Sequence, residues 1–341
     1  MKKTTSILLI YTGGTIGMIK DAETGALRNF DFDQLLDKIP ELKLLDCSIA
    51  STSFEKPLDS SNMQPEHWAQ MCRIIAENYD KYDGFVILHG SDTMSYSASA
   101  LSFMLENLSK PVIFTGSQLP IGDLRTDAKE NLITATQLAS LHKRGKPVLK
   151  EVCLYFEYKL YRGNRTTKDS AEYFEAFTSP NFPPLATSGV HLQVFEKNLL
   201  RTKKKTLLVH EKLDTHILIV HLFPGISAEL LRKNMEEPMV KGILLKTYGT
   251  GNAPSEEWFI DLLKNLLKRG IPIVNVTQCS TGSVQMGNYE TSTSLKKIGV
   301  VSGKDITTEA AVTKMMYLLA QDLTLTVFKT IFETSIRGEI S

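Results

Sequence analysis

The stretch that most constrains the fold lies near the start of the chain, at residues 7–18, and reads Ile-Leu-Leu-Ile-Tyr-Thr-Gly-Gly-Thr-Ile-Gly-Met. Its apolar run is typical of a strand buried in a parallel sheet. The run ends at Thr12, and two glycines follow, which permit a sharp turn and a close approach of other groups to the backbone. Thr15 is therefore predicted to lie just past the carboxyl end of a buried strand, where ligands bind in open α/β sheets. A strand that merely ends in a tight turn is the alternative. A phosphate-binding loop is disfavoured because neither glycine-rich phosphate pattern is present.

Two further stretches repeat this pattern of an apolar run followed by glycine and small polar residues. Residues 84–94 read Gly-Phe-Val-Ile-Leu-His-Gly-Ser-Asp-Thr-Met, and residues 111–118 read Pro-Val-Ile-Phe-Thr-Gly-Ser-Gln. Several such turns at one carboxyl edge of a sheet would form a pocket rich in hydroxyl and N–H donors. For each turn a purely structural role is the alternative. Asp92 would then be the N-cap of the following helix, and His89 a packed strand residue.

Helical periodicity alternates with these strands. Three helices are predicted in the first half from the apolar residues on one face: Trp68, Met71, Cys72, Ile75 and Tyr79 of the first; Met94, Ala98, Leu101, Leu105 and Leu108 of the second; Ala128, Leu132, Ala135 and Ala139 of the third. The second half has predicted strands at 217–224, 242–248 and 273–276, a helix with Ser255 as its N-cap, and a final helix over 308–319. This alternation predicts two α/β domains with mainly parallel sheets. We place them at residues 1–193 and 214–341, joined by a linker over 194–213.

The composition excludes several classes of function. The 341 residues include 39 Lys plus Arg and 38 Asp plus Glu, and the net charge of +1 gives no indication of a nucleic-acid or membrane partner. The four cysteines, Cys47, Cys72, Cys153 and Cys279, are far apart and form no C-x-x-C pattern, so no metal site, disulfide framework or cofactor is expected. Scattered thiols suit a reducing compartment, and no apolar run could span a bilayer, so a cytoplasmic location is predicted.

The charged candidates for chemistry are Asp92 and Lys168. Lys168 ends the stretch Arg-Gly-Asn-Arg-Thr-Thr-Lys at residues 162–168, which would ordinarily be a solvated loop. A threonine hydroxyl needs activation before it is a nucleophile. A lysine whose pKa is lowered by desolvation from about 10.4 toward 7–8 can take that proton. A carboxylate can orient the lysine or bind a substrate ammonium. Thr or Ser with Lys and Asp is thus sufficient for acyl transfer to a small polar substrate, provided that the fold brings them together.

Five stretches together resemble the signature sequences of bacterial-type L-asparaginases, and most closely those of the cytoplasmic type I branch. They are Tyr11-Thr12-Gly13-Gly14-Thr15-Ile16-Gly17, Asp59-Ser60-Ser61-Asn62-Met63, His89-Gly90-Ser91-Asp92-Thr93-Met94, Thr115-Gly116-Ser117-Gln118 and Arg165-Thr166-Thr167-Lys168. The resemblance continues through residues 248–254 and Gln278-Cys279, and so covers nearly the whole chain in order. It implies a large N-terminal domain built on a mixed sheet, a smaller flavodoxin-like C-terminal domain, and self-association as intimate dimers and often tetramers.

The same resemblance implies hydrolysis of L-asparagine to L-aspartate and ammonia through a covalent β-aspartyl-threonine intermediate. Thr15 matches the nucleophile of the family, and Ser91, Asp92 and Lys168 match its Thr–Asp–Lys group. The substrate-binding positions that match are Asp59, Ser60, Ser61, Ser91 and Asp92. In some type I enzymes a second, allosteric asparagine is bound by residues that match Thr167, Lys246 and Cys279.

The chain departs from the family pattern at several positions. Ser91 stands where threonine is usual, which keeps the hydroxyl. Ala26 stands where many members have a flap tyrosine that helps to activate the nucleophile. Lys246 replaces an arginine of the allosteric site. Tyr289 falls near a glutamate that glutamine-using type II members donate from the partner chain, which predicts a preference for asparagine.

Three other functions are alternatives to this one. A broad-specificity asparaginase-glutaminase is the nearest. A tRNA-dependent amidotransferase subunit shares this catalytic domain, but the near-neutral charge and a Thr-Gly-Gly-Thr turn that begins at residue 12 speak against it. A non-catalytic small-molecule sensor is disfavoured because every hydroxyl and charge of the main catalytic set is kept.

Overall fold

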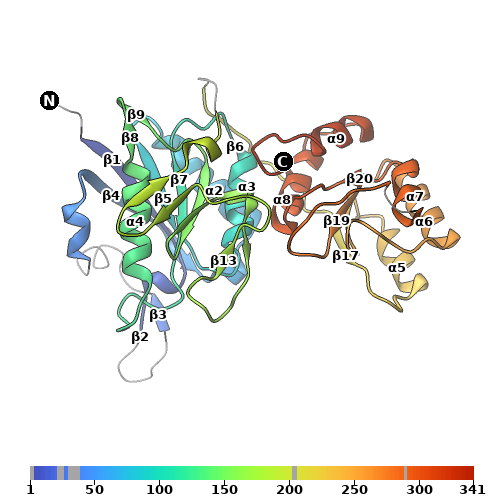
Figure 1. Cartoon of the computed structure of the whole chain (residues 1–341), viewed down its shortest axis with the longest axis horizontal. Helices are drawn as coiled ribbons and strands as arrows, with labels where there is room; N and C mark the ends of the chain where they lie inside the picture. The colour runs from blue at the N-terminus through green and yellow to red at the C-terminus, as the bar shows by residue number, and fades with distance from the viewer. Residues whose placement is uncertain (1–3, 21–26, 30–38, 202–205, 288–289) are drawn as a thin grey trace. The chain divides into compact units, whose positions relative to one another are not determined.

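The structure is a computed structural model that describes residues 4–20, 27–29, 39–201, 206–287 and 290–341. The chain divides into two compact units, Met1–Glu211 and Lys212–Ser341 (Figure 1). This division falls within the segment 194–213, whose role as a linker stays a prediction. Ala26 and Tyr289, which we singled out above, lie outside the described residues. In the part of the chain that the structure describes, no helix has the length and apolar character needed to cross a bilayer.

An eight-stranded sheet forms the centre of the first unit, in the order β15-β14-β11-β10-β7-β5-β1-β4. Its strands are β1 (Thr5–Gly13), β4 (Cys47–Leu58), β5 (Gly84–Leu88), β7 (Val112–Thr115), β10 (Val152–Phe156), β11 (Lys159–Arg162), β14 (Ala186–Ser188) and β15 (Leu192–Val194). The five strands from β10 to β4 are parallel, whereas β11, β14 and β15 run antiparallel to their neighbours. The mixed sheet predicted for the N-terminal domain is therefore confirmed.

Helices cover both faces of this sheet, because its central strands are apolar on both sides. Ile7, Val86 and Ile113 share one face and pack in a cluster with Leu132 and other side chains of α4 (Ala128–Ser140). The alternate residues of the same strands, such as Phe85, are also fully buried. Helix α3 (Met94–Met104) contacts β7 and β10 and pairs with α2 (Pro65–Glu77).

Two predicted helices end earlier than their apolar pattern indicated. Tyr79 lies beyond the end of α2, although the inner face from Trp68 to Ile75 is buried as predicted. Leu105 and Leu108 lie beyond the end of α3. Leu105–Glu106 forms β6 instead, which pairs with β16 (Leu208–Val209), and Asn107 has a positive φ of 63° that ends helical geometry.

The remaining elements of the first unit are short and connect these layers. They are η1 (Thr15–Gly17), β2 (Met18–Lys20), β3 (Leu27–Asn29), η2 (Pro40–Leu44), η3 (Ser60–Asn62), β8 (His142–Lys143), β9 (Lys146–Pro147), η4 (Gly163–Arg165), β12 (Thr167–Lys168), β13 (Phe177–Thr178) and η5 (Glu196–Asn198).

The second unit is built on a four-stranded parallel sheet, as predicted. Its strands follow the chain order β17 (Ile217–His221), β18 (Gly242–Thr247), β19 (Ile273–Thr277) and β20 (Val301–Ser302). The helices are α5 (Ala228–Met235), α6 (Glu257–Lys268), α7 (Glu290–Ile298), α8 (Thr308–Leu319) and α9 (Leu325–Phe332). Two predictions are wrong here. The N-cap of α6 is Glu256 rather than Ser255, and α9 follows the helix that we expected to be the last.

Candidate active site

Four neighbouring strands of the first sheet end at the same edge, and each leads into one of the predicted polar turns. In sheet order these strands are β7, β5, β1 and β4, all parallel (Figure 1). They are followed by Gln118, Ser91, Thr15 and Ser60 respectively. Segments that are far apart in the sequence are thus brought to one carboxyl edge, which is the place where open α/β sheets bind ligands.

The turns at this edge are in direct contact, and glycine is required where they meet. Gly14 has a φ of 88°, and a Cβ atom there would lie 2.4 Å from the backbone nitrogen of Gly90. A Cβ atom on Gly90 would lie 2.5 Å from Oγ of Ser60. The hydroxyl of Thr93 donates to the carbonyl of Ser60 over 2.7 Å. The turns after β1, β4 and β5 therefore approach one another too closely to admit a side chain at Gly14 or Gly90, and Thr15 and Ser91 follow these two glycines directly in the sequence.

Thr15 opens the single turn η1, and its surroundings hold that turn in place. Its own side chain is half-buried, whereas Ile16 and Gly17 are buried. Gly17 packs against the ring of Tyr11, because a Cβ atom on this glycine would lie 2.2 Å from the phenolic oxygen. Burial raises the pKa of Tyr11 to about 12, so this phenol stays protonated near neutral pH. Thr15 is thus a partly accessible hydroxyl on a rigid turn.

The fold brings Ser91, Asp92 and Lys168 together, as predicted. The ammonium of Lys168 donates to Oγ of Ser91 over 2.8 Å and to Oδ1 of Asp92 over 2.6 Å. The lysine side chain is 18% exposed and the aspartate side chain 63% exposed. The lysine is therefore mostly buried, and the aspartate carboxylate is accessible to solvent. Thr93 is the N-cap of α3, so the alternative prediction that Asp92 holds this position is wrong.

The segment that precedes Lys168 is buried. It is not the solvated loop that its basic residues predicted. Arg165 is 1% exposed, and its guanidinium lies 5.2 Å from the ring centroid of Phe182. Arg162 is also buried, and its Nε donates to the carboxylate of Glu151 over 2.6 Å. Both cations have partners outside the segment 162–168, which explains why the local pattern was misleading.

Gln118 belongs to this cluster, although the sequence reasoning gave its amide no role. Oγ of Ser91 donates to Oε1 of Gln118 over 3.2 Å, and Nε2 of Gln118 donates to the carbonyl of Tyr173 over 3.1 Å. The single hydroxyl of Ser91 thus accepts from Lys168 and donates to Gln118. The glycine and serine before Gln118 marked the turn, but nothing local indicated which way the amide points.

A buried carboxylate fixes the backbone beneath Gln118. Asp127 accepts from the backbone N–H groups of Gln118, over 2.9 Å, and Leu119, over 3.1 Å, and from the side chain of Asn131 over 3.1 Å. Asn131 also donates to the carbonyl of Gly116 over 3.0 Å. Burial raises the pKa of Asp127, while these donors act in the opposite direction. Asp127 is a second residue that the sequence reasoning missed.

The predicted substrate-binding turn after β4 is organised around Asp59. Oδ1 of Asp59 accepts from the backbone N–H and from the hydroxyl of Ser61, each over 2.8 Å. These two bonds hold the pKa of the Asp59 carboxyl below its usual range. Ser60 is buried and Ser61 is exposed. A contact between substrate and any of these three residues stays a prediction.

His89 is buried and packed, as predicted, but it lies directly after β5 rather than in the strand, where it stabilises the following turn. Its Nδ1 lies 2.7 Å from the carbonyl of Gly90, which can only accept, so Nδ1 carries the proton. Burial lowers the pKa of His89 to about 4, so the ring is neutral and Nε2 accepts from Oγ of Ser97 over 2.8 Å. Oγ of Ser97 in turn accepts from Nε1 of Trp68 over 2.8 Å. This buried chain of donors and acceptors joins α2, α3 and the Gly90 turn.

The three predicted allosteric residues belong to different units. Thr167 precedes Lys168 in β12 of the first unit. Lys246 lies in β18 and Cys279 follows β19 in the second unit, where Nε2 of Gln278 donates to the carbonyl of Lys246 over 2.9 Å. That the three form one site stays a prediction. Within the ranges that the structure describes, no group of three or more His, Cys, Asp or Glu side chains is arranged to hold a metal ion.

Comparison with known proteins gives consistent results along the whole chain. Sequence models for the asparaginase N-terminal domain and for the glutaminase/asparaginase C-terminal domain match residues 6–200 and 216–332. L-asparaginase 1 of Escherichia coli strain K12 is 43% identical over 337 residues, which cover 98% of each chain. The solved structure of L-asparaginase I from Vibrio cholerae has a TM-score of 0.90 and 40% identity, covering 99% of both chains. The thermostable L-asparaginase from Thermococcus kodakarensis has a TM-score of 0.90 and 33% identity, again covering 99% of both chains.

Proposed function

The chain belongs to the asparaginase family, and we propose that it hydrolyses L-asparagine to L-aspartate and ammonia with Thr15 as the nucleophile. The observation that carries this proposal is the contact of Lys168 with both Ser91 and Asp92 at the sheet edge where Thr15 lies. A hydroxyl next to a hydroxyl–lysine–carboxylate group is a sufficient arrangement for acyl transfer. The identity to asparaginases over nearly the full length supports the same reaction.

The proposed reaction has two steps. In the first, Oγ1 of Thr15 attacks the side-chain amide carbon of asparagine, a C–O bond forms, the C–N bond breaks, and the nitrogen leaves as ammonia after it gains a proton. In the second, water attacks the resulting β-aspartyl ester, releases aspartate and returns a proton to Thr15. The Ser91 hydroxyl, held between Lys168 and Gln118, relays protons to and from the reacting atoms, and Asp92 orients the ammonium of Lys168.

The substrate is held by its charged ends in this proposal. Ser60 and Ser61 bind the α-carboxylate with hydroxyl and N–H donors. The exposed carboxylate of Asp92 binds the α-ammonium. Because the family resemblance gives this chain no type II glutamate, we propose a preference for asparagine over glutamine. Size alone discriminates between amides that differ by one methylene only about 10–200-fold.

Ammonia release from asparagine, from glutamine and from buffer alone tests the proposal against its alternatives. Release from asparagine with a much lower kcat/KM for glutamine supports an asparaginase. Comparable kcat/KM values indicate a broad-specificity asparaginase-glutaminase, and no release above buffer indicates a non-catalytic sensor. In the same assay Lys168→Met and Asp92→Ala are each expected to lower kcat/KM at least ~10²-fold. Ser91→Thr keeps the hydroxyl and is the matched control, with near-normal activity.

We also propose that the chain acts in the cytoplasm as a dimer or tetramer, in keeping with the type I resemblance. Sedimentation velocity tests the assembly, and a monomer at micromolar concentration would contradict it.

A second asparagine bound by Thr167, Lys246 and Cys279 would act on Lys168 through the adjacent Thr167. We expect a sigmoidal rate dependence on asparagine that Lys246→Arg shifts to lower concentration, because a guanidinium holds a carboxylate bidentately. Hyperbolic curves for both proteins would contradict this allosteric site.

A further inference from the structure

A groove with a volume of about 590 Å³ lies in the first unit, between the β8–β9 hairpin and the segment 196–201. Its charged lining consists of five cationic side chains and one carboxylate: Lys143, Arg144, Lys146, Lys150, Arg201 and Glu196. The local charge is therefore +4, whereas the net charge of the whole chain is only +1. Such concentration of one sign in a concave site raises the local concentration of anions.

Most of these cations have no anionic partner. Lys143 is paired with Glu196 over 2.6 Å, and this ion pair joins the two walls of the groove. Among the described residues, no carboxylate is paired with the other four cationic side chains of the groove. The described residues of the first unit thus leave most of the positive charge of the groove without a paired carboxylate.

The hairpin itself is arranged at a cost to its stability. Lys143 and Lys146 are directly opposite each other in the antiparallel pair β8–β9, and like charges in that position are destabilising. Arg144 has a φ of 53° and Gly145 a φ of 72°, so a further cationic side chain occupies the left-handed turn between them. The ion pair of Lys143 with Glu196 offsets part of this repulsion, and a bound anion would relieve the rest.

The opposite wall is fixed by buried contacts, so the groove is preformed. The carboxylate of Glu151 accepts from the backbone N–H of Leu200 over 2.7 Å and from Nε of Arg162 over 2.6 Å. Arg162 also donates to the carbonyl of Asn198 over 2.8 Å. Both members of this ion pair are almost completely buried. The volume lies within the range of about 300–1,000 Å³ that is usual for small-molecule sites.

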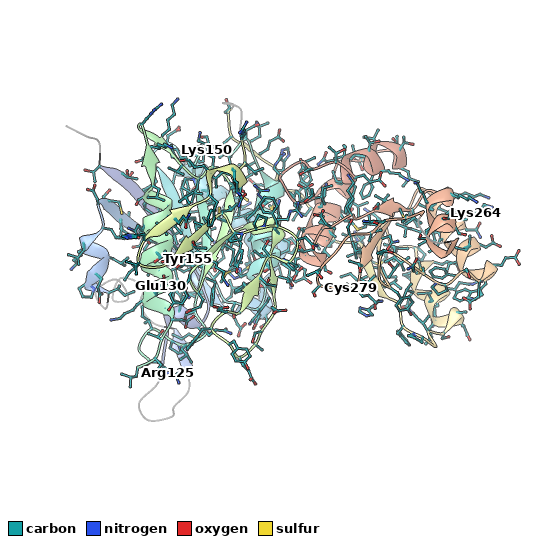
Figure 2. All side chains as sticks on the ribbon, in the orientation of Figure 1. Arg125, Glu130, Lys150, Tyr155, Lys264 and Cys279 are labelled. Carbon is teal, nitrogen blue, oxygen red and sulfur yellow. The ribbon has the colours of Figure 1, made fainter. Side chains whose placement is uncertain are left out.

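The groove is distinct from the candidate active site. Lys150 precedes the amino end of β10, whereas Ser91 and Gln118 follow the carboxyl ends of β5 and β7, which run parallel to β10. Figure 2 shows Lys150 and Tyr155 at the two ends of this strand. The groove is therefore at the opposite edge of the sheet from the hydroxyl–lysine–carboxylate cluster.

We propose that this groove binds a small ligand that carries a polyphosphate group. The four cations that have no carboxylate partner among the described residues match the three or four charges of a polyphosphate. A single carboxylate or phosphate would leave most of these cations uncompensated. The planar guanidinium of arginine binds two phosphate oxygens at once, and the lysine ammonium binds them as a point charge. Val148 and Leu199 add an apolar part to the lining, against which the nucleoside of a nucleotide could pack. The volume of about 590 Å³ corresponds to a small ligand rather than to a nucleic acid.

Isothermal titration of the full-length protein with tripolyphosphate, and separately with ATP, tests this site. The test variant is the double substitution Lys146→Glu with Lys150→Glu, and the matched control is Lys264→Glu, an exposed lysine on α6 outside the groove (Figure 2). We expect saturable binding to wild type and control, and at least ~10-fold weaker binding to the double variant, because two charge-assisted contacts are reversed. Asparaginase activity is expected to be unchanged in all three proteins and serves as the check on folding.

Several outcomes would overturn the proposal. They are an absence of binding to wild type up to millimolar ligand, equal weakening in the Lys264→Glu control, and full-strength binding to the double variant. Tighter binding of a single-stranded oligonucleotide than of tripolyphosphate would assign the groove to nucleic acid instead. Tighter binding of ATP than of tripolyphosphate would identify a nucleotide as the source of the polyphosphate group. Because binding is measured without asparagine, its outcome does not depend on the proposed hydrolysis.

Discussion

Substitution by alanine is expected to change the stability of the protein in different directions at two serines of α3. Ser97 and Ser99 are both completely buried on the same helix. Oγ of Ser97 accepts from Trp68 and donates to His89, whereas Oγ of Ser99 has no partner among the described residues. Ser97→Ala therefore removes a hydroxyl that satisfies two buried groups, and Ser99→Ala removes one that is itself unsatisfied.

The magnitude follows from the groups that are left without partners. Each buried donor or acceptor that loses its partner costs about 1–3 kcal/mol, so Ser97→Ala is expected to lower the free energy of unfolding by roughly 2–6 kcal/mol. The space vacated by one oxygen atom is too small for a water molecule to replace it. Ser99→Ala is expected to be neutral, or to stabilise the protein by up to about 1 kcal/mol, because no bond is lost.

Thermal unfolding of wild type and both variants, at one protein concentration, measures the difference. For a unit of this size about 1 kcal/mol corresponds to a shift in Tm of roughly 2–4 °C. Ser97→Ala should unfold several degrees below wild type, and Ser99→Ala at or above it. Equal Tm values for the two variants would refute the hydrogen-bonded chain from Trp68 through Ser97 to His89.

Further predictions concern pH and the support beneath Gln118. Burial holds the pKa of folded His89 at about 4, below its ordinary value, so the unfolded state binds more protons and stability should fall as pH drops from about 6.5 to 4. Urea unfolding at pH 7 and 4.5 measures this loss, which should be smaller in His89→Gln. Burial and the charges of Asp127, Glu130 and Glu175 raise the pKa of Glu157 to about 7, so its ionisation destabilises the folded state above that pH. Glu157→Gln should therefore unfold at a higher Tm than wild type at pH 8 and lose this advantage at pH 4.5. Asp127→Asn replaces an acceptor of the Gln118 backbone N–H and the Asn131 side chain with an amide N–H, so kcat/KM should fall at least ~10-fold. Unchanged kinetics would exclude a positioning role for Asp127.

The strands and the place of the site could be predicted because they depend on local patterns. The apolar runs before Thr15, Ser91 and Gln118 each form a buried strand, and parallel pairing then brings their ends to one edge. The contact of Lys168 with Ser91 and Asp92 needed the family resemblance as well, since nothing in the spacing of residues 91 and 168 implies it.

The features that the sequence did not reveal depend on partners outside the segment that carries each pattern. Helix α3 ends at Met104 because Leu105–Glu106 pairs with β16, about a hundred residues later. Arg162 can be buried because the carboxylate of Glu151, directly before β10, neutralises its charge. Asp127 holds the backbone N–H of Gln118, and the carbonyl of Tyr173 orients its side-chain amide. A local periodicity contains none of this information.

The role of Thr15 is tested most directly by trapping the proposed ester. Wild-type protein is mixed with asparagine, quenched in acid within milliseconds to seconds, digested, and analysed by mass spectrometry with fragmentation across residues 12–15. The account predicts one β-aspartyl group on Thr15 and none on the buried Thr12, together with loss of turnover in Thr15→Ala. An adduct on another residue, or a Thr15→Ala protein that keeps more than a few per cent of wild-type kcat, would contradict it.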